Sequence, residues 1–96
     1  MHKLKLNNMA TFKINKNQAR KDLITDFESY VRTNYRYFRR NESAKKNVKI
    51  VIGKEYITIH IKVYYGVICN DLKFLNRMGL LKASTRSLNW LKDYGV

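Results

Sequence analysis

Aromatic rings and cations alternate with apolar residues from Tyr56 to Tyr65, where the sequence reads YITIHIKVYY. Successive side chains of a β-strand point to opposite faces of the sheet, so this strand would bury its isoleucines and present the other set. The presented set is Tyr56, Thr58, His60, Lys62 and Tyr64. Rings that stack on bases, beside cations that contact phosphates, are what a surface needs to bind single-stranded nucleic acid. The pattern predicts such a face, although β-propensity alone also favours tyrosine in a strand.

A second group of cations recurs at helical spacing. Arg32, Arg36 and Arg40 follow one another every four residues and would project from one side of a helix as a row. Guanidinium groups bridge phosphate oxygens, so the row suits a nucleic-acid backbone. Further basic residues would extend the row into a positive ridge: Arg39, Lys45, Lys46 and Lys49. The alternative is a solvated helix end whose arginines only complement the helix dipole.

The segment 71–95 resembles a helix-turn-helix unit. Gly79 would be the turn glycine, and Leu80 and Leu88 would be buried after it. The resemblance implies that Arg86 and Asn89 lie on a helix that enters the groove of a duplex. The alternative is a helical hairpin that only closes the hydrophobic core.

The charge balance indicates the class of partner. The chain has 96 residues, and its 20 Lys and Arg against 7 Asp and Glu give a formal net charge of +13. Such a surface favours a polyanion. We expect a non-enzymatic nucleic-acid-binding protein, with DNA slightly preferred over RNA because of the terminal helices. The alternative is a small phage or mobile-element effector that binds a host protein or ribonucleoprotein, because tyrosine and arginine are also enriched at protein interfaces.

Chemistry of other kinds has little support in the sequence. No histidine and carboxylate pair has metal-ligand spacing, and no glycine-rich phosphate loop is present, so we expect neither catalysis nor a cofactor. Cys69 is the single cysteine, which excludes an intramolecular disulfide. The sequence shows no signal peptide and no apolar segment long enough to span a bilayer, so we expect a cytoplasmic protein without a membrane partner.

The apolar spacing predicts an α+β fold. Leu23, Phe27 and Val31 mark one face of a helix over residues 18–40, which would follow an N-cap at Asn15 or Asn17. We expect this long N-terminal helix to pack on a small antiparallel sheet, whose main part is a hairpin over about 48–65 that turns at Gly53.

The remaining segments complete the predicted organisation. A short strand is expected over residues 11–14, and two short helices in a helical hairpin would follow the sheet, with Asn70 and Ser84 as N-caps. Residues 1–10 would form a basic N-terminal arm and residues 11–96 a single globular α+β domain. The unpaired edge of so small a sheet also allows a homodimer.

Overall fold

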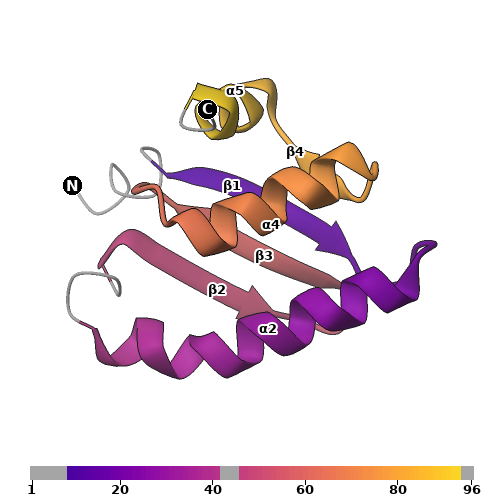
Figure 1. Cartoon of the computed structure of the whole chain (residues 1–96), viewed down its shortest axis with the longest axis horizontal. Coiled ribbons are helices and arrows are strands. Elements are labelled where there is room, and N and C mark those ends of the chain that lie inside the picture. The colour runs from indigo at the N-terminus through magenta and orange to yellow at the C-terminus, as the bar shows by residue number, and fades with distance from the viewer. Residues whose placement is uncertain (1–8, 42–45, 94–96) are drawn as a thin grey trace.

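The computed structural model describes residues 9–41 and 46–93, apart from the side chains of Tyr35, Phe38 and Arg39. Its elements are β1 (Ala10–Asn15), α2 (Lys21–Arg40), β2 (Val48–Ile52), β3 (Tyr56–Ile61), α4 (Gly66–Arg77), β4 (Leu81–Ala83) and α5 (Thr85–Asp93). The strands form a four-stranded sheet in the order β2-β3-β1-β4, in which every neighbouring pair is antiparallel (Figure 1). Up to β4, this is the split β-α-β topology of ferredoxin-like folds, and α5 is added after it.

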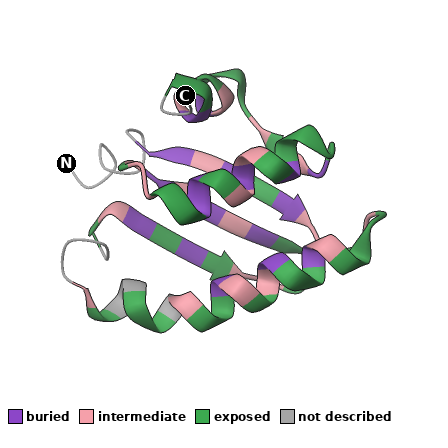
Figure 2. Ribbon diagram, viewed as in Figure 1, coloured by how far each residue is buried: buried purple, intermediate pink, exposed green. Residues whose placement is uncertain are grey.

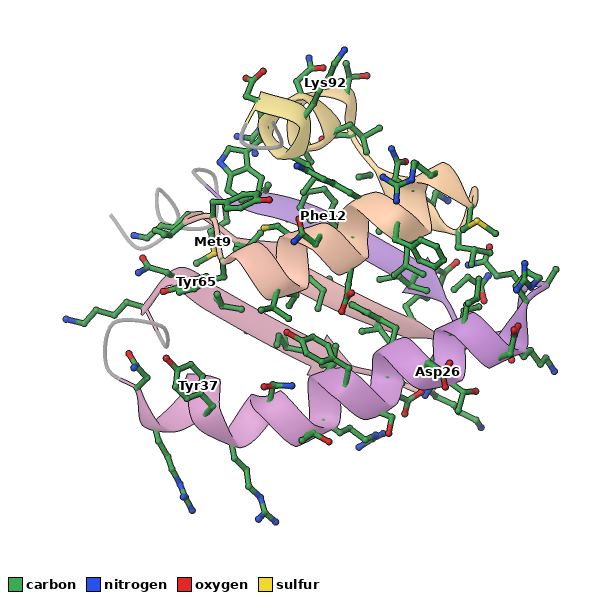
Figure 3. The ribbon with its side chains drawn as sticks, viewed as in Figure 1. Met9, Phe12, Asp26, Tyr37, Tyr65 and Lys92 are labelled. Carbon is green, nitrogen blue, oxygen red and sulfur yellow. The ribbon has the colours of Figure 1, made fainter. Side chains whose placement is uncertain are left out.

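The hydrophobic core lies between one face of the sheet and the helices. Helices α2 and α4 cross that face side by side (Figure 1), and α5 packs beside β1. Phe12 of β1 lies on the same side, with its ring centroid 6.3 Å from that of Trp90 on α5 (Figure 3). Five of the strand residues that point inward are completely buried: Phe12, Ile14, Ile57, Ile59 and Ile61. Burying them stabilises the fold and leaves the opposite face of the sheet without a helical cover.

The α+β class, the antiparallel sheet and the long helix are confirmed, but the long helix is not the first element. Strand β1 precedes α2 and occupies the centre of the sheet, where it pairs with both β3 and β4. Met9 and Ala10 are buried, so the last positions of the expected arm belong to the folded part, while residues 1–8 lie outside the described residues. Residues 42–45 lie outside them as well.

The predicted helical hairpin at the C-terminus is wrong, because β4 lies between α4 and α5 and pairs with β1. Helix α4 ends in a Schellman motif in which Leu80 N donates to Leu75 O at 2.9 Å and Gly79 has a φ of 75°. The chain then extends, and Leu81 pairs with Ile14. The likeness to a helix-turn-helix unit therefore fails, since a strand replaces the short turn that such a unit needs.

Two element boundaries also differ from the prediction. Strand β3 ends at Ile61 and α4 already begins at Gly66, so the hairpin does not continue to residue 65 and Asn70 is not an N-cap. Helix α2 begins at Lys21 after Arg20, whose φ of 61° makes the turn into the helix without a side-chain cap. The predicted cap of the last helix is confirmed: Ser84 Oγ accepts a hydrogen bond from Ser87 N at 3.2 Å.

Candidate nucleic-acid interface

The open face of the sheet is formed by the strand residues that alternate with the buried ones, and Figure 2 shows this alternation along β1 and β2. These residues are Thr11, Lys13, Asn15, Lys49, Val51, Tyr56, Thr58, His60 and Lys82. Lysine comes from β1, β2 and β4, while β3 supplies a tyrosine and a histidine. Within the four described strands, no aspartate or glutamate lies on this face. The face is therefore a cationic surface with aromatic rings, and it has no internal counter-charge.

The strand register brings these side chains together in rows. Lys13 lies directly opposite Lys82 on one side and Thr58 on the other, and Thr58 lies opposite Val51. The next row joins Lys49, His60 and Thr11. Side chains directly opposite in an antiparallel pair have Cβ atoms about 4.5–5.5 Å apart, and like charges there are destabilising. The Lys13–Lys82 pair is thus an unfavourable arrangement for the free protein that an anion would relieve.

Tyr56 is the more accessible of the two rings, with 36% of its surface exposed. The ammonium group of Lys13 lies 5.8 Å from the centroid of the ring, within the range of a cation–π interaction. Ring and cation are therefore close enough to contact a base and the adjoining phosphate of one strand.

His60 is held in place from the neighbouring strand. Its Nδ1 lies 2.9 Å from Thr11 Oγ1. Partial burial lowers the pKa of the imidazole below its ordinary value, and the charges of Lys49 and Lys13 lower the pKa further. The ring is consequently mostly neutral at pH 7.

A depression of about 510 Å³ lies on the open face over β1 and β4, next to Tyr56 of β3. Its lining includes Lys13, Lys82 and the hydroxyl-bearing residues Thr11 and Ser84. The volume is in the range of pockets that hold a small organic ligand. Hydroxyl and ammonium donors around a hollow of this size suit a phosphate with part of its nucleoside.

The predicted arginine row lies on α2, which covers the opposite face of the sheet. Arg32 is engaged by Glu28, because its Nε donates to Glu28 Oε2 at 2.9 Å, and this hydrogen bond lowers the pKa of the carboxyl group despite its partial burial. Arg36 and Arg40 are exposed, as is Lys46 ahead of β2. The Arg39 side chain and Lys45 lie outside the described residues. The structure thus places the row and the open face on opposite sides of the sheet, and the ridge stays a prediction because residues 42–45 lie outside the described residues.

The other predicted residues lie outside the four strands. Lys62 and Tyr64 follow the end of β3, and the Tyr64 hydroxyl donates to Asn70 Oδ1 of α4 at 3.2 Å. The Arg86 guanidinium donates to the carbonyl of Met9 at 3.1 Å, which ties it to the start of β1. Asn89 is exposed on α5 and lines a groove between α4 and α5.

Lys13 and Lys82 are two cations of the face that sequence reasoning missed. The alternation of residues 11–14 indicates that Lys13 faces away from Phe12 and Ile14. No local signal identifies Lys82, because β4 has three residues and its partner in β1 is about seventy positions away in the chain.

Searches for related proteins found no protein-family model, no curated protein and no solved structure that matches this chain. In the part of the chain that the structure describes, no group of three or more His, Cys, Asp or Glu residues is placed to hold a metal ion. Among the described helices, none combines the length and the apolar character that a membrane span requires.

Proposed function

We propose that this protein binds single-stranded nucleic acid on the open face of its sheet and catalyses no reaction. The observation that carries the proposal is the opposition of Lys13 and Lys82 on a face without carboxylates. Phosphates bound there would replace a repulsion by two attractions and release condensed cations, which supplies most of the affinity in such complexes.

The aromatic residues of β3 supply the contacts to bases. Tyr56 and His60 are four residues apart on one strand, which separates the two rings by about 13 Å at 3.3 Å per residue. Tyr56 is exposed and His60 is partly exposed, and each has a lysine nearby, Lys13 for Tyr56 and Lys49 for His60. A flexible single strand, whose bases are unstacked, can use both rings. A duplex hides its bases from a flat surface of this kind.

The fold supports the same use of the sheet. RNA-recognition modules bind unpaired bases on the open face of a four-stranded antiparallel sheet whose other face carries helices. This likeness is one of architecture, and the argument for function comes from the residues on the face. The preference for DNA depended on a C-terminal helical hairpin, and β4 removes that basis. DNA and RNA strands of equal length are therefore both needed in the test.

The test is fluorescence anisotropy with labelled single-stranded DNA, single-stranded RNA and duplex DNA at low salt. We expect saturable binding of at least one single strand, weaker binding of the duplex, and a linear fall of log affinity with log salt concentration. Absence of binding to every oligonucleotide contradicts the proposal and favours a protein partner. Equal affinity for duplex and single strands contradicts the role of base stacking.

A further inference from the structure

A groove between α2 and α4 has a chemistry opposite to that of the basic surface. It encloses about 240 Å³, and its lining includes Phe27 and Tyr30 of α2, Phe74 and Leu75 of α4, and one carboxylate from each helix, Asp26 and Asp71. Figure 3 labels Asp26 on α2, and Figure 1 shows the two helices side by side over the covered face of the sheet. The groove is therefore separate from the open face.

Both carboxylates of the groove lack a salt bridge within residues 9–41 and 46–93, although the chain has 20 Lys and Arg. Two other acids of α2 do have partners: Asp22 pairs with Arg20, and Glu28 pairs with Arg32 and Lys16. In so basic a protein, two carboxylates without a basic partner can instead bind a cation from solution.

Asp71 is partly buried, and burial raises the pKa of its carboxyl group. The pKa of Tyr30, which also lines the groove, is raised first by burial and then by the negative charge of Asp71. A bound cation would stabilise the Asp71 carboxylate, whose charged form burial disfavours.

The walls of the groove are apolar and aromatic. The rings of Phe27 and Tyr30 lie 6.4 Å apart between centroids and are tilted by 35°. Phe74 is 40% exposed at the edge, which is a large accessible surface for a phenylalanine. Such walls favour an apolar chain or ring over a hydrated metal ion, and aromatic faces also attract an organic cation.

We propose that the α2–α4 groove binds an organic cation in which an ammonium or guanidinium group is attached to an apolar chain or ring. The charged group would lie at Asp71 and Asp26, and the apolar part would lie against Phe27, Tyr30 and Phe74. The proposal does not depend on nucleic-acid binding, since it uses the covered side of the sheet and acidic residues.

The net charge of +13 opposes the approach of any cation. At 0.15 M ionic strength, however, the Debye length is about 8 Å, so exposed lysines on the far side of the sheet are largely screened from the groove. Contacts within the groove are screened much less, because they are partly desolvated. Binding should therefore survive at physiological salt.

The test uses small probes with the full chain at 0.15 M salt and pH 7, followed by NMR chemical shifts and calorimetry. The probes are 2-phenylethylamine, phenylacetate with the same ring and a negative charge, and ethylamine without a ring. We expect saturable binding of 2-phenylethylamine, with shifts at Tyr30 and Phe74, and at least tenfold weaker binding of the other two. Equal binding of phenylacetate, or no saturable binding of the amine, overturns the proposal.

The variants Asp71→Asn and Asp26→Asn test the charged contacts, and Asp22→Asn on the exposed first turn of α2 is the matched control. Asparagine keeps the shape of aspartate, so Asp71→Asn should fold, and circular dichroism checks this. We expect at least a tenfold loss of amine affinity for Asp71→Asn, a smaller loss for Asp26→Asn and none for Asp22→Asn. Unchanged affinity in Asp71→Asn, or an equal loss in Asp22→Asn, contradicts the assigned site.

Discussion

Replacing Lys13 and Lys82 together by glutamine should reduce the salt dependence of binding to single strands. Each phosphate that a protein neutralises on a single strand contributes about 0.7 to the slope of log affinity against log salt, so losing two contacts should lower the slope by about 1.4. Across a fourfold rise in salt, from 50 to 200 mM, a slope change of about 1.4 corresponds to about a sevenfold smaller loss of affinity. Fluorescence anisotropy over this range measures the slope.

The matched control is Arg36→Gln with Arg40→Gln, which removes the same charge from exposed positions of α2. We expect its slope to equal that of the unchanged protein. An equal reduction in both double variants would mean that only net charge matters, and an unchanged slope in the lysine variant would remove the sheet face from the account.

The double variant of Lys13 and Lys82 should not lose stability, so a change in its binding can be assigned to lost contacts with the nucleic acid. Opposed like charges on neighbouring strands are destabilising, and cross-strand pairs contribute roughly 0.2–1 kcal/mol. Lys13→Gln with Lys82→Gln should therefore have an equal or slightly larger free energy of unfolding in urea. A marked loss of stability would show that the two lysines support the fold instead of binding a ligand.

Three further predictions concern the titration of His60, the N-cap of α5 and the glycine after α4. Because the pKa of His60 is lowered in the folded protein, the unfolded chain binds more protons as the pH falls through about 6.5, and the contribution of His60 to stability decreases. Bound phosphates should raise the pKa of His60, so the affinity for a single strand should increase from pH 7 to pH 5.5. The variant His60→Gln should lack this increase. Ser84→Ala removes the N-cap of α5 and should cost about 1 kcal/mol in urea unfolding, whereas Ser29→Ala on the exposed face of α2 should cost nothing. Gly79→Ala places an alanine at a residue with a φ of 75°, where no neighbouring atom obstructs the added Cβ, and should cost about 1–2 kcal/mol of stability. Gly66→Ala is equally unobstructed and should not destabilise the protein. Equal effects at the two glycines would contradict the Schellman assignment.

The elements with a clear periodicity were predictable from the sequence. The apolar spacing of Leu23, Phe27 and Val31 identified α2 to within three residues at its start, because a stripe at steps of three and four has no other regular conformation that buries it. Alternation likewise identified β2 and β3 and assigned Ile57 and Tyr56 to opposite faces. These features depend on neighbours in the sequence, which is why they are visible there.

The features that depend on distant contacts were not predictable. Leu81–Ala83 is too short to show alternation, and it becomes a strand only because β1 offers an unpaired edge beside it. The alternation continues through Val63 and therefore predicts strand after Ile61, yet β3 ends at Ile61 and α4 begins at Gly66. The candidate face was consequently found in part. Tyr56, Thr58 and His60 were expected on it, whereas Lys49 was expected in the ridge with the helix arginines. The meeting of Lys13 with Lys82 follows only from the sheet order.

The most direct test of the sheet face as the binding surface is an NMR titration of the isotope-labelled chain with an unlabelled single-stranded oligonucleotide. We expect the largest shift changes at Lys13, Thr58 and the imidazole of His60, with Arg36 and Arg40 of α2 unaffected. Shift changes confined to α2, with the resonances of β1 and β3 unchanged at saturation, would contradict the account.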